Sequence, residues 1–189
     1  IEANKLKQYQ RVIEILGQHN NKLPYRNHIN LMTAKAHLRA GNAKQAIEVL
    51  ESLMPNLPHP KFVITADNYP AVIDYAAALQ TLNLTQKAQT KLISLDAFLA
   101  SVTLEDKAHA LMNRAQINTL LNNRPLALSL LEQAIAAGWM SDLDKQWWLF
   151  EDNQILKTLA NEPGYQQALR TIKSNRASLL KQLRQITGL

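Results

Sequence analysis

Three segments of this 189-residue chain repeat one pattern of small and turn-forming residues, which strongly limits how the chain can fold. The segments align on alanines that we expect where two helices cross: Ala46, Ala88 and Ala127. Small residues coincide twelve positions earlier, at Ala34, Ala76 and Ala115, and turn residues coincide five positions earlier, at Gly41, Asn83 and Asn122. Leucines coincide four positions later, at Leu50, Leu92 and Leu131. Self-similarity of this kind predicts a stack of repeated helix–turn–helix units.

The composition supports an all-α protein. Hydrophobic residues make up 47% of the chain and charged residues 19%, which is typical of folded domains. Glycine is scarce, with 5 residues, while the abundant Leu, Ala, Gln and Lys lose little side-chain freedom in a helix. The chain has no cysteine, which excludes disulfides, thiolate zinc sites and a cysteine nucleophile. A chain without cysteine suits the cytosol and the periplasm equally.

Apolar spacing predicts helices over residues 3–20 and about 27–40, with Asn27 as a plausible N-cap. Residues 55–69 are rich in proline and are predicted to form a connection, whose apolar segment 62–65 (FVIT) should be pinned to the core. Asp67 or Asn68 can cap the next helix, and Thr85 the one after it. Thr103 and Asp106 resemble a capping box.

The repeated segments resemble the tetratricopeptide repeat, which has a small residue in helix A, a glycine-like turn and an alanine in helix B. The resemblance covers about residues 27–137 in three degenerate copies, whose alanine spacings of 42 and 39 exceed the usual length of about 34. It implies a right-handed superhelix of antiparallel helix pairs. We therefore expect a single domain, in which residues 1–26 form an N-terminal helix and residues 138–189 form a Trp-rich segment and a closing helix.

The same resemblance implies a concave ligand groove lined by helix A of each unit. Its positions correspond to Leu31, Lys35, Leu38, Arg39, Ile73, Ala77, Gln80, His109, Met112, Gln116 and Thr119. This mixture of apolar and polar residues suits an extended peptide or a helix. The clamp with which some relatives hold a C-terminal carboxylate is missing, because its positions hold Leu31, Lys35, Asp74, His109 and Asn113. A role as a chaperone-tail adaptor is therefore disfavoured.

The end of the chain resembles the tail that follows tetratricopeptide arrays in bacterial membrane-anchored winged-helix regulators and repeat-containing nucleotide cyclases. The matching features are Gly138-Trp139, Trp147-Trp148, Leu156 to Leu159, and Glu162 through Tyr165. The resemblance implies that this chain, which begins at Ile1, is a fragment of a larger bacterial signalling or transcription-regulatory protein. A membrane-anchored parent would place the fragment in the periplasm rather than the cytoplasm.

Two features of the tail leave alternatives open. The aromatic cluster of Trp147, Trp148 and Phe150 can plug the end of the array or form a binding hot spot. The last helix carries a basic face, formed by Arg170, Lys173, Arg176, Lys181 and Arg184. An apolar sector lies beside it, formed by Leu169, Ile172, Leu179, Leu180 and Leu183. Its basic face can be solvated, or can contact anionic lipid or an acidic partner.

No residue pattern indicates catalysis, a cofactor or a metal site. The five histidines lack the spacing of metal ligands, and we expect them to be exposed or half-buried. The acidic pairs at 105–106 and 151–152 lie where helices should begin, where the helix dipole favours negative charge. Residues 61–140 hold six basic and six acidic residues, which disfavours direct nucleic-acid binding, and no apolar run is long enough for a membrane span.

The sequence thus predicts a non-enzymatic module for protein–protein interaction or sensing, with a protein or peptide partner. The alternative is a structural scaffold or dimerisation domain, such as a homodimer, acting through the Trp-rich tail and the basic last helix.

Overall fold

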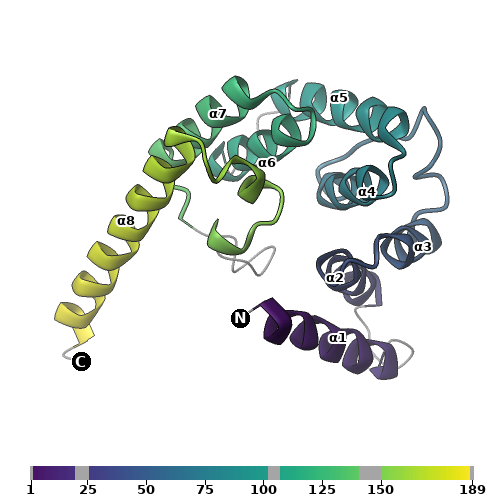
Figure 1. Cartoon of the computed structure of the whole chain (residues 1–189), viewed down its shortest axis with the longest axis horizontal. Coiled ribbons are helices and arrows are strands. Elements are labelled where there is room, and N and C mark those ends of the chain that lie inside the picture. Colours follow the sequence, from purple (N-terminus) through teal and green to yellow (C-terminus); the bar gives the residue numbers. More distant parts are fainter. Residues whose placement is uncertain (1, 20–25, 102–106, 141–149, 188–189) are drawn as a thin grey trace. The chain divides into compact units, whose positions relative to one another are not determined.

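A computed structural model describes residues 2–19, 26–101, 107–140 and 150–187 (Figure 1). These residues form the helices α1 (Glu2–His19), α2 (Arg26–Arg39), α3 (Ala43–Leu53), α4 (Tyr69–Thr81), α5 (Thr85–Ser101), α6 (Lys107–Leu120), α7 (Arg124–Ala136) and α8 (Pro163–Thr187). Two short 3-10 helices, η1 (Phe150–Asp152) and η2 (Leu156–Leu159), precede α8. The described residues contain no strand, and the prediction of an all-α fold is confirmed.

The chain divides into two compact units, and each is described here by itself. The first unit, residues 1–98, contains α1 to α4 and most of α5. The second unit, residues 99–189, contains α6, α7, η1, η2 and α8. In the first unit α2 packs on α1, α3 and α4, and in the second α7 packs on α6 and α8. The grouping of all 189 residues into one domain stays a prediction.

The three predicted turn residues close their helices in the same way. Gly41, Asn83 and Asn122 all have positive φ, at 80°, 59° and 59°. In each turn the following residue donates its backbone N–H to the carbonyl five positions back: Asn42 to His37 (2.9 Å), Leu84 to Leu79 (2.9 Å) and Asn123 to Asn118 (2.8 Å). This is the Schellman arrangement, which satisfies carbonyls left open at a helix end. Gly138 ends α7 likewise, with φ of 97° and a Trp139 to Ala134 bond of 3.0 Å.

The aligned alanines are all buried. Five of them have no exposed surface, namely Ala34, Ala76, Ala88, Ala115 and Ala127, and Ala46 is 1% exposed. The aligned leucines Leu50, Leu92 and Leu131 are at most 1% exposed. A methyl side chain at the crossing lets two helix backbones approach closely, while the leucine one turn later fills the core beside it. The alignment of the three repeats deduced from the sequence therefore matches the positions at which the helices pack.

The connection between α3 and α4 is anchored by a different residue from those predicted. Val63, within the apolar segment 62–65, is 73% exposed, whereas Leu57 has no exposed surface. Asn68 precedes α4 as predicted, but its side chain binds the connection and makes no capping hydrogen bond to the helix. It accepts from the Thr65 N–H at 2.9 Å and donates to the Val63 carbonyl at 3.1 Å. Val63 and Thr65 are exposed while Phe62 and Ile64 are half-buried, so the prediction that segment 62–65 is pinned to the core is confirmed only in part.

Two helix boundaries differ from the predicted caps by one or two residues. Thr85 is the first residue of α5, so Leu84 holds the capping position and its carbonyl accepts from the Ala88 N–H at 3.1 Å. Asn27 lies inside α2, which begins at Arg26. The predicted capping box of Thr103 and Asp106 lies outside the described residues. Such shifts are expected because helix ends fray and their assignment varies by a residue or two.

The core of the second unit contains the aromatic residues that follow α7. Phe150 has no exposed surface; its ring stacks on Tyr165 at 4.9 Å between centroids and meets the edge of Trp139 at 6.1 Å. Leu156 and Leu159 of η2 and Ile172 of α8 join the same cluster. Phe150 therefore serves packing rather than a binding hot spot. Trp147 and Trp148 lie outside the described residues.

Candidate binding surface

The predicted groove begins on α2, where Leu31, Lys35 and Leu38 are spaced at four and three residues and so share one helical face. All three are partly buried. Lys35 is engaged: its Nζ donates to Asp74 Oδ2 of α4 at 2.5 Å, and the two side chains are 19% and 15% exposed. This ion pair joins the first helices of two consecutive pairs. Lys35 therefore links α2 to α4 and is not an open cationic side chain at the edge of a groove.

Arg39 ends α2 and faces the N-terminal helix. Its guanidinium carbon lies 5.9 Å from the centroid of the Tyr9 ring of α1, within the range of a cation–π contact. The side chain is half-buried, as is Gln80 at the end of α4. Leu38 also packs against the small cluster of Ala43, Ala46 and Ala78. The accessible part of the α2 face is therefore formed mainly by Leu31 and Arg39.

Two predicted groove residues of α4 lie in the core. Ile73 is 3% exposed and Ala77 is 7% exposed. The α4 sequence is apolar on nearly all sides, with eight buried residues from Ala71 to Leu79, which is typical of a helix covered all round. Neither Ile73 nor Ala77 offers a ligand much side-chain surface, so their placement in an open groove is corrected.

Two predicted groove residues of α6 are likewise buried, and they belong to a polar network. Met112 has no exposed surface and Gln116 is 3% exposed. The Gln116 amide donates to Asn113 Oδ1 at 3.1 Å and accepts from Asn153 Nδ2 at 3.0 Å. Asn153 Oδ1 in turn accepts from the Leu156 N–H at 3.0 Å, which starts η2. Gln116 therefore positions the segment after η1 and does not face a ligand.

The remaining α6 positions of the predicted groove are half-buried. His109 lies in the first turn of α6, and the Thr119 hydroxyl donates to the Ala115 carbonyl of its own helix at 2.8 Å. The structure thus brings Leu31, Lys35, Leu38 and Arg39 together on α2. It removes Ile73, Ala77, Met112 and Gln116 from the accessible surface.

A buried lysine that the sequence prediction missed holds the connection against α5. Lys91 is 6% exposed; its Nζ donates to the His59 carbonyl at 2.6 Å and lies 5.2 Å from the centroid of the Phe62 ring. Burial lowers the pKa of this lysine from 10.5. Its spacing offered a signal, because Lys91 lies three residues after Ala88 and four before Leu95 on the inward face. Beyond it, Asn56, His59, Lys61, Phe62 and Val63 line a surface hollow of about 410 Å³.

Four of the five histidines are exposed or half-buried, as predicted. His28 and His59 are exposed, while His37 and His109 are half-buried. No group of three or more histidine or carboxylate side chains in the described ranges is arranged to hold a metal ion. Among the helices of that same part of the chain, none is both long and apolar enough to cross a bilayer.

His37 should make the stability of the first unit depend on pH. Its Nδ1 atom is buried without a hydrogen bond, and this burial lowers its pKa below 6.5, opposed in part by the Glu48 carboxylate. A folded-state pKa below the unfolded value means that the unfolded chain binds more protons as the pH falls through this range. Stability should therefore decrease from about pH 6.5 downward, until the folded-state pKa is passed.

Thermal unfolding at neutral and mildly acidic pH checks this prediction. The H37L substitution should reduce the loss of Tm on acidification, whereas H28Q, at an exposed histidine, should leave it unchanged. Equal losses in the wild type and H37L would contradict the assignment.

Solved structures, rather than family models, supply the known proteins to which this chain is similar. No protein-family model matches the chain. No curated protein matches it either. Among solved structures, the chain is similar to a putative kinesin light chain from Podosopora anserina with nearly identical TPR-like repeats, at 18% identity and a TM-score of 0.49, over 94% of this chain and 90% of that one. A single-residue variant of that protein gives 17% identity and a TM-score of 0.49, over 95% and 91%. The description of the fold accordingly rests on the helices themselves.

Proposed function

We propose that this chain is a protein-interaction module of the tetratricopeptide type, which binds a peptide or a helix along α2 in the first unit. The observation that carries the proposal is the recurrence of one helix–turn–helix geometry, with the same left-handed turn and the same buried alanines in each pair. Packing and turn closure account for the repeated residues. Leu31 and Arg39 of α2, which differ from their counterparts in α4 and α6 and are only partly buried, are the residues we assign to partner recognition.

The α2 face offers a mixture of apolar and cationic groups at helical spacing. Leu31 supplies an aliphatic contact, and Arg39 supplies a planar cation held near the Tyr9 ring. An arginine beside an aromatic ring suits a carboxylate or a carbonyl of a bound peptide, because its fork of donors is already oriented. Lys35 contributes less, since Asp74 neutralises it. A peptide with an apolar anchor and a nearby acidic group fits this surface best.

A peptide-display library panned against the whole chain tests the proposal. Affinities of the selected peptides would be measured by fluorescence polarisation for the wild type, for L31Q with R39Q, and for a control with I93Q and K87Q. Ile93 is 61% exposed and Lys87 is exposed, both on α5. Loss of a binding hot spot should weaken affinity about tenfold or more in the α2 variant. Lys35 and Leu38 are left unchanged, because replacing them would disturb the ion pair or the core.

The controls define which results would contradict the proposal. Circular dichroism must first show that both double variants keep the helicity of the wild type. Selected peptides that bind the α2 variant as tightly as the wild type would contradict the site, and a library that yields no binder at all would contradict the function.

The finer proposal concerns the parent protein, which we propose to be a bacterial signalling or transcription-regulatory protein. Its support is the tail resemblance, in which Gly138 ends α7 and Trp139, Phe150 and Tyr165 form one buried cluster. The coding region upstream of Ile1 tests it. A winged-helix domain or a membrane anchor there agrees with the proposal, and an unrelated catalytic domain other than a nucleotide cyclase would contradict it.

Truncating the chain after Gly138 would not test the alternative of a dimerisation domain. Removing the residues after Gly138 would delete Trp139, Phe150 and Ile172 from the core of the second unit. The second unit would therefore lose its core together with any interface. Substitutions of exposed residues on α8 separate the two effects.

A further inference from the structure

The last helix continues an apolar line beyond the core that it helps to build. Tyr165, Leu169 and Ile172 begin the line, and Leu179, Leu183 and Ile186 extend it at alternating spacings of four and three residues, with Arg176 at the intervening position. Tyr165 and Ile172 are buried in the second unit at 4% and 0% exposure. Leu179, Leu183 and Ile186 are 41%, 46% and 81% exposed. The helix is therefore packed in its first half and exposed in its second half.

Arg176 marks the point where packing ends. Its guanidinium donates to both carboxylate oxygens of Glu151 at 3.1 and 3.2 Å, and to the Met140 carbonyl at 2.9 and 3.2 Å. This arginine was assigned to the basic face of the helix, and it is instead a partly buried structural contact. Beyond it, α8 extends past α6 and α7 (Figure 1).

The last helix has an unbalanced charge along its whole length. Residues 163–189 contain five basic residues and no acidic residue. With Arg176 engaged by Glu151, the others, Arg170, Lys173, Lys181 and Arg184, are exposed. At about 100° per residue, Arg184 lies about 100° and Lys181 about 160° around the helix from Leu183. The helix therefore has an aliphatic face and, turned away from it, a cationic face.

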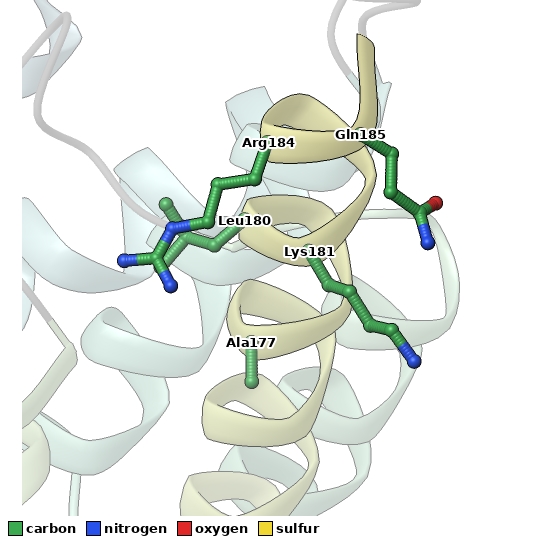
Figure 2. A pocket seen from close by; sticks show the side chains of 5 residues that line it. All are labelled: Ala177, Leu180, Lys181, Arg184 and Gln185. Atoms are coloured by element: carbon green, nitrogen blue, oxygen red, sulfur yellow. The ribbon is translucent and has the colours of Figure 1, made fainter. Parts of the chain in front are cut away.

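A surface hollow of about 500 Å³ lies on the cationic face, lined by Ala177, Leu180, Lys181, Arg184 and Gln185. Figure 2 shows the side chains of Leu180 and Arg184 on one side of the helix and those of Lys181 and Gln185 on the other. Leu180 is 57% exposed. With Lys181 and Arg184 both in its lining, this hollow suits a phosphate headgroup.

We propose that the C-terminal half of α8 lies on an anionic membrane surface, with Leu179, Leu183 and Ile186 among the acyl chains and Lys181 and Arg184 at the phosphate headgroups. Amphipathic helices of this composition bind interfaces through apolar burial together with attraction to anionic lipid. The proposal concerns the second unit and does not rest on the peptide site proposed for α2.

Two other occupants fit the surface less well. A second copy would bring two strongly basic segments together, and four aliphatic side chains fall short of the roughly 800 Å² per partner that stable interfaces bury. An acidic helix would find little charge beside the apolar line, because the flanking residues Asn175, Leu180 and Gln182 are uncharged. A lipid surface needs no matching seam and responds to the net charge of the whole segment.

Sedimentation of the whole chain with lipid vesicles tests the proposal. Vesicles of pure phosphatidylcholine would be compared with vesicles in which roughly one third of the lipid is phosphatidylserine. Binding should be about tenfold or more stronger to the anionic vesicles and should weaken as salt is added. L183Q with I186Q, and separately K181Q with R184Q, should each lower this binding about tenfold or more. I93Q with K87Q on α5 serves as the matched control and should bind like the wild type.

Each contrary result has a defined meaning, once circular dichroism shows unchanged helicity in every variant. Equal binding of the two α8 variants and the wild type would overturn the proposal, as would a lack of vesicle binding by the wild type. Self-association that L183Q with I186Q abolishes, without vesicle binding, would assign the face to a second copy. Binding of the wild type to poly-L-glutamate, without binding to vesicles, would assign this face of α8 to an acidic protein partner.

Discussion

Replacing Phe150 by alanine is expected to lower the free energy of unfolding of the second unit by about 3–5 kcal/mol. The ring is fully buried and touches Tyr165 and Trp139, so its removal loses both the transfer free energy of the ring and its packing against two aromatic neighbours. Urea unfolding followed by circular dichroism would measure the change. Because the chain comprises two units, the transition of the second unit must be resolved from that of the first.

The matched control for this experiment is L126A. Leu126 lies on α7 of the same unit and is 36% exposed, so its truncation should lower the free energy of unfolding by about 1–2 kcal/mol, well below the loss in F150A. A loss below about 1 kcal/mol in F150A would show that the ring is not part of a close-packed core. The aromatic cluster would then be available again as a binding surface.

Replacing Leu57 by alanine should destabilise the first unit by about 2–5 kcal/mol, although Leu57 lies in a proline-rich connection. It has no exposed surface, and it is the residue through which the connection reaches the core. V63A provides the comparison, since Val63 is 73% exposed and its truncation should cost about 0.5 kcal/mol or less. Thermal and urea unfolding of both variants would be compared. A larger effect of V63A than of L57A would restore the original prediction that segment 62–65 anchors the connection.

The features that the sequence predicted correctly are those set by neighbouring residues. Gly41, Asn83 and Asn122 could be identified as turns because glycine and asparagine tolerate positive φ at a helix end. The buried alanines could be identified because their spacing within each helix is fixed by the helical period. Both kinds of signal extend over a few residues, and so they survive in a single sequence.

The features that were missed depend on residues far apart in the chain. Lys35 binds Asp74, which is 39 residues away, and Arg176 binds Glu151, which is 25 residues away. Nothing local distinguishes these cations from solvated ones. Gln116 was similarly assigned to a groove because its buried partner, Asn153, lies 37 residues later. The candidate site was therefore predicted less well than the fold, since surface accessibility is decided by tertiary contacts.

The repeated turns also make the helix pairs separable as building blocks. In each turn the bonds that end one helix and begin the next are made by backbone groups within about ten residues, from His37 to Ala46 in the first pair. The hydrogen bonds of such a turn join residues that are close in sequence, and none of them involves another helix pair. A chain built in this way can be lengthened, shortened or recombined at its turns during gene duplication, while the faces of its helices diverge. The turn geometry is then the part of each pair that can stay constant while the exposed faces of the helices differ.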